Sequence, residues 1–380
     1  PEARSGEAHG RGGTLLKAAL RAARVRGLCH GWRGLAALGI DPAPAPTVGF
    51  VIERADWAIR WVGEHVCGEI DRLAPHTAAV TTKPQRLIDK VVHFGSQYMW
   101  LAWGHAMSNA NRYVTSFFHG KPEDGPDIAR HIDEFLASVP RLSRIVTAAS
   151  LVERRLIGWG VPEHKLVRIP IGVDTDLFTP PSPEQRARAR AALGIADHHI
   201  AVGSFQKDGV GWGAGLEPKL IKGPNVFLAA VERLKRDMPL FVVLSGPARG
   251  YVKAGLERLG VPYVHGYVDS HEDLAAYYHA LDLYLITARE EGGPMGLMES
   301  MASGVPVVST AVGMAPDLIR HGETGGLVQS EDVEALCAAA RDIIGGDLAT
   351  LRAAAREAVM CCDWRVVGRA HLEQVYQPLI

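Results

Sequence analysis

Two glutamates that flank a glycine-rich turn form the segment of the sequence best suited to chemistry. Glu291 comes directly before Gly292, Gly293 and Pro294, and Glu299 follows Glu291 by eight positions. Glycines let a backbone approach a ligand closely, and the free N–H groups at the start of a helix suit an anion such as a diphosphate. Carboxylates accept hydrogen bonds from sugar hydroxyls. The pattern therefore predicts a nucleotide-sugar site; the alternative is a capped surface helix whose two acids stay solvated.

A second segment supplies positive charge. A predicted strand ends at Gly203, and a glycine-rich loop with Lys207 and Lys222 follows it. A leaving nucleoside diphosphate gains negative charge in the transition state, and loss of a fixed cation there commonly costs about 10²–10³ in rate. We expect Lys222 to supply this cation, with Lys207 as a second one. The alternative for Lys207 is an ordinary solvated loop charge.

The elements that position these candidate residues can be predicted from apolar runs that alternate with helical stretches. From residue 47 onward, β-rich runs such as 47–52 and 113–118 alternate with amphipathic stretches. Prolines crowd into 180–183, and the alternation restarts with the run 199–205. Such alternation predicts parallel sheets covered on both faces by helices. Two such halves place their ligands in the cleft between them, at the carboxyl ends of the strands.

The stretch from 287 to 328 resembles the donor-binding signature of family 4 glycosyltransferases, which have the GT-B fold. It reads TAREEGGPMGLMESMASGVPVVSTAVGMAPDLIRHGETGGLV, and its two glutamates have the Glu-x7-Glu spacing of that family. The resemblance covers roughly 110–330 and implies an α/β protein with two doubly wound Rossmann-like domains facing across a cleft. The segments that we predict are a basic, disordered extension at 1–46, an acceptor-side domain at 47–176, a nucleotide-sugar-binding domain at 177–362 and a C-terminal helix at 363–380 that returns to the first domain.

The resemblance implies roles around the glycine-rich turn. Glu299 would hold the ribose hydroxyls of the donor, and Glu291 would hold the transferred sugar. The diphosphate would lie against Gly293, Pro294 and Met295. The family more often has Gly-Phe-Gly at this turn, so we expect a sugar pocket of a different shape.

The cationic segment departs from the family pattern. Lys222 and the glycine after it match a family lysine, but Ser204 stands where the family has an arginine. Gly203 and Ser204 would then lie against the donor. Lys207 is our candidate replacement for the arginine, although a lysine is a point charge and cannot match the planar fork of a guanidinium.

On the acceptor side, one histidine fits the family. His119 ends the predicted strand in SFFHG and resembles the family's acceptor-side histidine at a strand end, where it would hydrogen-bond a hydroxyl of the reacting sugar. The alternative is a structural loop histidine, which is the reading that we favour for His93 and His105. The family's Gly-Gly turn after the first strand is replaced here by residues 53–56, so no further acceptor residue can be carried over.

These features predict a glycosyltransferase that moves a sugar from a nucleoside-diphosphate donor to a hydroxyl acceptor, which could be a glycan, a lipid or a small molecule. The resemblance implies retention of the anomeric configuration. We expect no cofactor and no bound metal, because Lys222, Lys207 and the helix start replace a divalent cation. Three alternatives remain: a nucleotide-sugar epimerase, a phosphorylase-like enzyme with pyridoxal phosphate, and a non-catalytic subunit that binds nucleotide sugar.

Composition indicates which partners and which cellular compartment to expect. The 380 residues carry a formal net charge of −1, which argues against a nucleic-acid partner. Five cysteines are few and odd in number, which favours a reducing compartment, so we predict a cytoplasmic protein; without a Cys-x-x-Cys spacing we expect no structural zinc site. Residues 1–46 carry seven basic and three acidic residues, and 14–26 could form a short basic helix. That helix would give peripheral contact with a membrane surface; the alternative, which we favour, is a poorly ordered extension.

Overall fold

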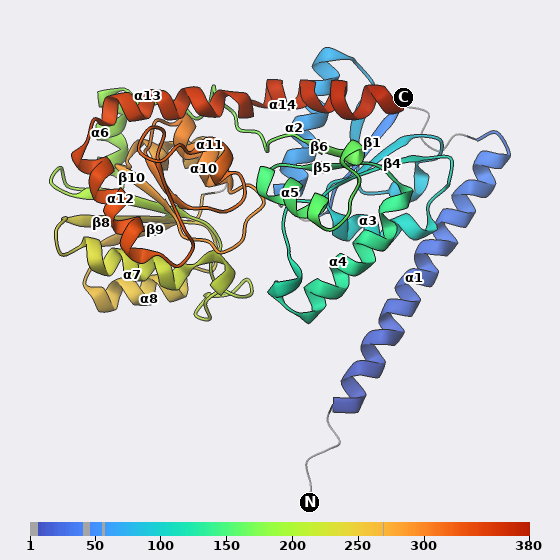
Figure 1. Cartoon of the computed structure of the whole chain (residues 1–380), viewed down its shortest axis with the longest axis horizontal. Helices are drawn as coiled ribbons and strands as arrows, with labels where there is room; N and C mark the ends of the chain where they lie inside the picture. The colour runs from blue at the N-terminus through green and yellow to red at the C-terminus, as the bar shows by residue number, and fades with distance from the viewer. Residues whose placement is uncertain (1–6, 41–45, 55–57, 269) are drawn as a thin grey trace, which may run out of the picture.

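The computed structural model describes residues 7–40, 46–54, 58–268 and 270–380, with 7–19 as backbone only. Figure 1 shows two α/β domains side by side, with a helical segment at the C-terminal end of the chain crossing from one to the other. Each domain contains one parallel sheet of six strands. The predicted α/β class with two parallel sheets is therefore confirmed.

The N-terminal domain has the strand order β2-β1-β3-β4-β5-β6. Its strands are β1 (Val48–Val51), β2 (Ala78–Thr81), β3 (Val91–Phe94), β4 (Arg112–Ser116), β5 (Leu142–Thr147) and β6 (Leu166–Arg168). Its helices are α2 (Ala58–Leu73), α3 (Gln97–Trp103), α4 (Pro126–Ser138) and α5 (Ser150–Gly158). Helix α2 illustrates why the helices pack on the sheet. Val62, Val66 and Ile70 repeat every four residues and are buried, so one apolar face of the helix covers the sheet.

The C-terminal domain has the order β12-β11-β10-β7-β8-β9. Its strands are β7 (Ile200–Phe205), β8 (Leu240–Ser245), β9 (Tyr263–Gly266), β10 (Leu283–Ile286), β11 (Val307–Thr310) and β12 (Gly326–Val328). Its helices are α6 (Pro183–Ala192), α7 (Pro224–Leu234), α8 (Gly250–Leu259), α9 (His271–His279), α10 (Met295–Ala302), α11 (Ala315–Leu318), α12 (Val333–Gly345) and α13 (Leu348–Val359).

The order of this second sheet matters for function. Strands β8 and β9 lie on one side of β7, and β10, β11 and β12 lie on its other side. The order in which the chain adds strands therefore reverses between the neighbours β7 and β10, although all strands are parallel. Ligands of doubly wound sheets bind at such a switch point, outside the carboxyl ends of the strands. The two segments with predicted chemistry follow β7 and β10, so the topology brings them to one place.

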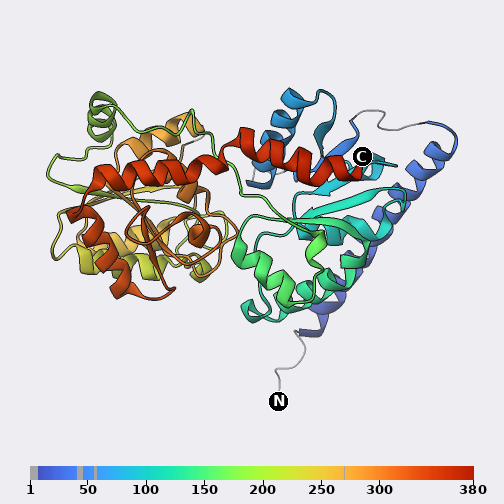
Figure 2. The same cartoon turned by 45° about the horizontal axis from the view of Figure 1, so that its top comes forward.

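The end of the chain ties the two domains together. Val173 donates a backbone hydrogen bond to Cys362 at 2.8 Å, beside the crossing between the domains. Helix α14 (Trp364–Ala370) then packs on α2, so closely that a Cβ on Gly368 would lie 2.4 Å from the Cβ of Glu69. Figure 2 shows this crossing from a second direction. The π-helical turn that follows places Tyr376 against His93 at 2.6 Å, inside the N-terminal core.

The N-terminal segment differs from our expectation of a mostly disordered extension with a short helix. Helix α1 covers Glu7–Ala37, far more than 14–26. Buried side chains of its second half anchor it: Val25 and Cys29 join the core, and the Arg86 guanidinium lies 4.8 Å from the ring of Trp32. Figure 1 places α1 on the side of the N-terminal domain away from the C-terminal domain. Within the described residues, none of the helices combines the length and apolarity that a membrane crossing requires.

Candidate active site

A left-handed glycine sets the position of Lys222. Gly223 has φ +66° and precedes α7, and a Cβ there would lie 1.7 Å from the carbonyl oxygen of Thr287. Only glycine fits this contact. The Thr287 hydroxyl also donates to the carbonyl of Gly223 at 2.9 Å, and Arg289 N–H donates to Ile221 O at 2.8 Å. The loop before α7 is therefore fastened to the segment after β10, next to Glu291.

Lys222 and Glu291 form an ion pair in the cleft between the domains. Both side chains are largely buried, with 23% of the lysine and 13% of the glutamate exposed. His119 follows β4 in the other domain, and its neighbour Phe118 would lie 2.6 Å from a Cβ on Gly292, so the imidazole is near enough for the charges of Glu291 and Lys222 to act on it. The surrounding protein excludes water and lowers the pKa of His119, although the nearby Glu291 carboxylate opposes this shift. The imidazole is thus neutral at pH 7 and can accept or donate a hydrogen bond.

The turn after Glu291 packs closely against residues of the N-terminal domain. A Cβ on Gly292 would lie 2.6 Å from the Cβ of Phe118 in the N-terminal domain, and one on Gly293 would lie 2.8 Å from Ile171 Cδ1. Pro294 occupies the N-cap position, and Met295 begins α10. Leu297 N–H donates to the Pro294 carbonyl at 2.9 Å, and the N–H groups before it belong to the first turn of α10, a position that suits an anion.

Glu290, which the sequence analysis missed, joins the domains. Its carboxylate receives two hydrogen bonds from the Arg155 guanidinium, at 2.6 and 3.2 Å, and one from the Gly120 N–H at 3.3 Å. Burial raises the pKa of Glu290, but the hydrogen bonds and charge of Arg155 outweigh burial and lower it overall. The only sequence signal was a second acid beside Glu291, and its partner on α5 is 135 positions away.

Glu299 lies apart from the other predicted residues. It is only 5% exposed, inside the C-terminal domain, and its Oε2 accepts a 2.8 Å hydrogen bond from the Tyr278 hydroxyl. Burial raises the pKa of Glu299 to about 7, although the bond from Tyr278 acts in the opposite direction. The structure therefore brings Glu291, Lys222 and His119 together at the cleft, while Glu299 is enclosed one and a half turns into α10.

Gly203 and Ser204 face the interior of the domain and not the cleft. A Cβ on Gly203 would lie 2.3 Å from Leu281 Cδ1, so this glycine makes room for packing. Ser204 is 1% exposed, and its hydroxyl accepts a hydrogen bond from Arg249 at 3.2 Å. Arg249 also forms an ion pair with Asp208 at 3.0 Å, which holds the loop after β7 in place. This buried arginine, not a donor-facing one, is the partner of Ser204.

Lys207 lines a cavity of about 570 Å³ between the domains. Its Nζ lies 3.6 Å from the centre of the Trp212 ring. Burial lowers the pKa of the neighbouring Lys219, and the charges of Lys222 and Lys207 lower it further, so three lysines share this side of the cleft. Trp61 from α2 also lines this cavity and stacks on His271 from α9, with 3.9 Å between the ring centres.

Two other groups with possible chemistry are structural. Asp174 and Asp176 have an Asp-x-Asp spacing that could suggest a divalent cation, but Asp174 accepts backbone N–H bonds from Asp176 and Leu177, and Asp176 pairs with Arg365. His93 is fully buried between Tyr376 and Ser116, and His105 lies exposed in a short turn away from the cleft residues.

Known proteins resemble both the sequence and the fold. Residues 209–345 match a family model described as glycosyl transferases group 1. The chain is 30% identical over 197 residues to a GDP-mannose-dependent alpha-(1-6)-phosphatidylinositol monomannoside mannosyltransferase of Mycolicibacterium smegmatis, covering 48% of each protein. It is 33% identical over 201 residues to a D-inositol 3-phosphate glycosyltransferase of Corynebacterium aurimucosum, covering 49% of this chain and 44% of the relative. The matches thus span about half the length of these curated relatives.

Solved structures match over much more of the chain. Anabaena HepE in complex with UDP and glucose superposes with a TM-score of 0.70 over 87% of this chain and 99% of its own, at 17% identity. Sucrose-phosphate synthase of Thermosynechococcus elongatus gives 0.67 over 88% and 99%, at 19% identity. At such identities the likeness concerns the fold alone, and it confirms the predicted GT-B arrangement of two Rossmann-like domains.

Proposed function

We propose that this protein transfers a sugar from a nucleoside-diphosphate donor to a hydroxyl group of an acceptor. The observation that carries the proposal is the meeting of Lys222, Glu291 and His119 in the cleft, beside the N-terminal end of α10. A cation, a carboxylate and a neutral imidazole at a helix start are the groups that a diphosphate, a sugar and an attacking hydroxyl require.

In the proposed reaction, donor binding replaces one partner of Lys222. The diphosphate takes the ammonium group and the N–H groups of Gly293 and Met295, and Glu291 is then free to accept hydrogen bonds from the transferred sugar. Lys207 and Lys219 add positive charge on the same side. His119 lies on the opposite domain, where it can bond a hydroxyl of the reacting sugar. Glu299 reaches the ribose in this scheme only if donor binding opens its contact with Tyr278.

We further propose that the transfer retains the anomeric configuration and uses neither a divalent cation nor a cofactor. Three lysines and a helix start supply the positive charge that a metal ion would otherwise bring to the leaving group. The acceptor we propose is a polyhydroxylated compound, free or on a lipid, because the two curated relatives are named for inositol-containing acceptors.

Contact with a membrane surface would accompany a lipid acceptor. Leu20 and Leu28 are exposed on α1 among Arg21, Arg24 and Arg26, a mixture that binds anionic bilayers. Cosedimentation with vesicles that contain anionic lipid, compared with vesicles of neutral lipid, tests this contact. Equal sedimentation with both would contradict it.

A screen of nucleotide sugars tests the main proposal. Melting temperature is measured with UDP, GDP, ADP and TDP sugars, starting with GDP-mannose, since a ligand that binds the folded state raises it. The donor that binds is then incubated with inositol phosphates, and the product is analysed by NMR for its anomeric configuration, with and without EDTA. Transfer with retention that survives EDTA is expected. Conversion of the donor without acceptor would favour an epimerase, and binding without turnover a non-catalytic subunit.

A further inference from the structure

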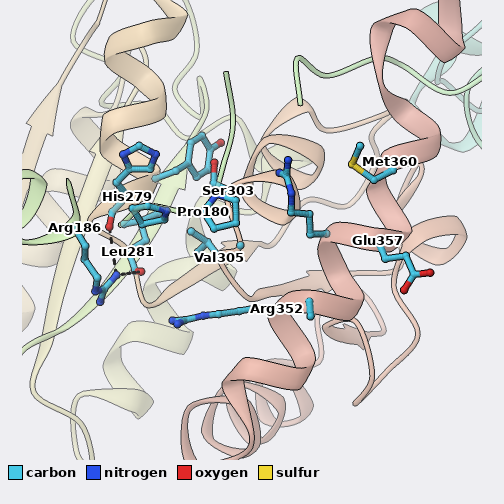
Figure 3. Close-up of a pocket in the computed structure, with 14 residues that line it drawn as sticks. Pro180, Arg186, His279, Leu281, Ser303, Val305, Arg352, Glu357 and Met360 are labelled. Atoms are coloured by element: carbon cyan, nitrogen blue, oxygen red, sulfur yellow. Dashed lines mark hydrogen bonds between the residues drawn. The ribbon is translucent and has the colours of Figure 1, made fainter. Parts of the chain in front are cut away.

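A second cavity of about 570 Å³ lies wholly within the C-terminal domain. Its walls come from the prolines before α6, the end of α9, the segment after α10 and one side of α13 (Figure 3). None of the residues that line it also lines the cavity between the domains. Whatever binds here would therefore leave the proposed donor site free.

Positive charge is in excess around this cavity. Arg186 donates to Asp282 at 2.6 Å, and Arg190 donates to the same carboxylate at 3.0 Å. Arg356 is committed to backbone carbonyls, including those of Phe178 and Thr175 at 3.0 Å each. Asp282 is therefore already shared by two guanidinium groups, and a third arginine, Arg352, also lines the cavity.

Arg352 is a charge that forms no ion pair within the residues that the structure describes, although the carboxylate of Asp282 acts on it from a distance. Figure 3 shows its side chain reaching from α13 across the cavity toward Arg186. Its buried Nε lacks a hydrogen-bond partner within the part of the chain that the structure describes. Burial lowers the pKa of the Arg352 guanidinium and the charge of Arg186 lowers it further, while the Asp282 carboxylate, already shared by two other arginines, opposes the shift without reversing it. Because arginine remains protonated in proteins, two like charges face each other here with space between them.

Ser303 is a second buried group that lacks a partner. It follows α10 directly, is 0% exposed and lines the same cavity. Its hydroxyl is without a hydrogen bond among the described residues. Native structures satisfy most buried polar groups, so a hydroxyl left unpaired at a cavity wall points to a ligand.

The cavity also selects the kind of ligand. Its volume exceeds that of a single inorganic anion, and Pro180, Leu281, Val305 and Met360 add apolar wall. Glu357 is exposed, and Figure 3 shows it on the part of α13 away from the Arg352 head group. We propose that this cavity binds a small phosphorylated sugar or polyol, with the phosphate on Arg352 beside Arg186 and a hydroxyl of the organic part on Ser303. Charged hydrogen bonds from guanidinium to phosphate are among the strongest that proteins form.

Calorimetric titration of the full chain with ribose 5-phosphate tests the proposal, with ribose as the uncharged control. Saturable binding of ribose 5-phosphate is expected for the native chain. Arg352→Gln should weaken it by about tenfold or more, and Ser303→Ala by a smaller factor. Arg258→Gln, an exposed arginine on α8, and Lys222→Ala, in the interdomain cleft, should both leave it unchanged.

Three results would overturn the proposal. The first is no saturable binding by the native chain in the millimolar range. The second is equal binding by Arg352→Gln, provided that its melting temperature shows a folded protein. The third is loss of binding in Lys222→Ala with retention in Arg352→Gln, which would place the phosphate in the cleft. Arg352→Lys, which keeps the charge but not the fork, should bind with intermediate affinity.

Discussion

The two ends of α10 face different surroundings. At its N-terminal end a glycine-rich turn opens on the cleft, and Lys222 lies beside Glu291 within reach of the other domain. At its C-terminal end Ser303 lines a cavity inside the C-terminal domain, and Arg356, which lines the same cavity, donates to the carbonyl of Ala302. The helix dipole favours anions at the first end, where Glu291 lies, and cations at the second, where Arg356 lies.

The difference teaches how one short helix can serve two kinds of site. At the N-terminal end the anion site that we propose is the backbone itself, and the Lys222–Glu291 ion pair would exchange its carboxylate for a phosphate. At the C-terminal end the backbone presents carbonyl oxygens, of which that of Ala302 accepts from Arg356, and carbonyl oxygens do not bind anions, so any anion must bind the side chains around it. Glu299 lies between the two ends and, through Tyr278, contacts the wall of the second cavity.

The largest effect should come from breaking the N-terminal end. Lys222→Ala should lower kcat/KM for the active donor by about 10²–10³, because the leaving diphosphate loses its closest fixed cation. Lys235→Ala, an exposed lysine just past the other end of α7, is the matched control and should change the rate little. Steady-state kinetics measure both. Equal rates for the two variants would show that Lys222 does not act on the leaving group.

The middle of the helix can be tested by pH. The pKa of Glu299 is about 7 in the folded state against an ordinary value of 4.5. The folded state thus keeps a proton that the unfolded chain has lost, so stability should fall as pH rises from about 4.5 to about 7, by on the order of 3 kcal/mol. Glu299→Gln should lack this component. Denaturant unfolding of both proteins at about pH 5 and about pH 8 gives the difference, and parallel pH dependence would contradict it.

The contact between the domains offers the next effect. Glu290→Gln should destabilise the protein by about 2 kcal/mol, less than for a fully buried ion pair because Arg155 is 22% exposed. Glu323→Gln breaks the exposed pair with Arg320 and should cost less than about 1 kcal/mol. Thermal unfolding compares the two, and a double-mutant cycle with Arg155→Met isolates the pair. A coupling energy near zero would mean that Glu290 does not hold the domains together.

Two glycines with nearly equal backbone angles allow a test of how Lys222 is positioned. Gly223 and Gly260 have φ of +66° and +63°, but a Cβ at Gly260 meets nothing within 4 Å. Gly260→Ala should cost about 1 kcal/mol from backbone strain alone. Gly223→Ala should cost more, because it also crowds the carbonyl of Thr287, and should lower turnover by displacing Lys222. If Gly223→Ala turns over normally, the loop does not position the lysine.

The smallest effect should appear at the C-terminal end. Ser303→Ala removes a buried hydroxyl that lacks a partner in the described residues, so without ligand the variant should be as stable as the native protein or more stable by up to about 1 kcal/mol. Equilibrium unfolding in buffer without phosphate measures this. A clear loss of stability would show that the hydroxyl is already satisfied in the ligand-free protein.

The sequence predicted the fold and the cleft residues for local reasons. Strand runs such as those of β7 and β10 are mostly apolar, and the glycines at 292 and 293 indicate the turn. Interior contacts between distant residues could not be predicted in this way. Arg249 meets Ser204 because the second sheet places the end of β8 beside β7, and Arg155 meets Glu290 because the two domains come into contact. The enclosure of Glu299 likewise depends on Tyr278 from another helix, which no spacing within 291–299 reveals.

A crystal structure of the chain with the nucleoside diphosphate of its donor tests the central claim most directly. The account predicts the diphosphate against the N–H groups at 293–295, with the Lys222 ammonium moved from Glu291 to a phosphate oxygen. A nucleotide whose diphosphate lies away from this turn, with the Lys222–Glu291 pair intact, would contradict the account.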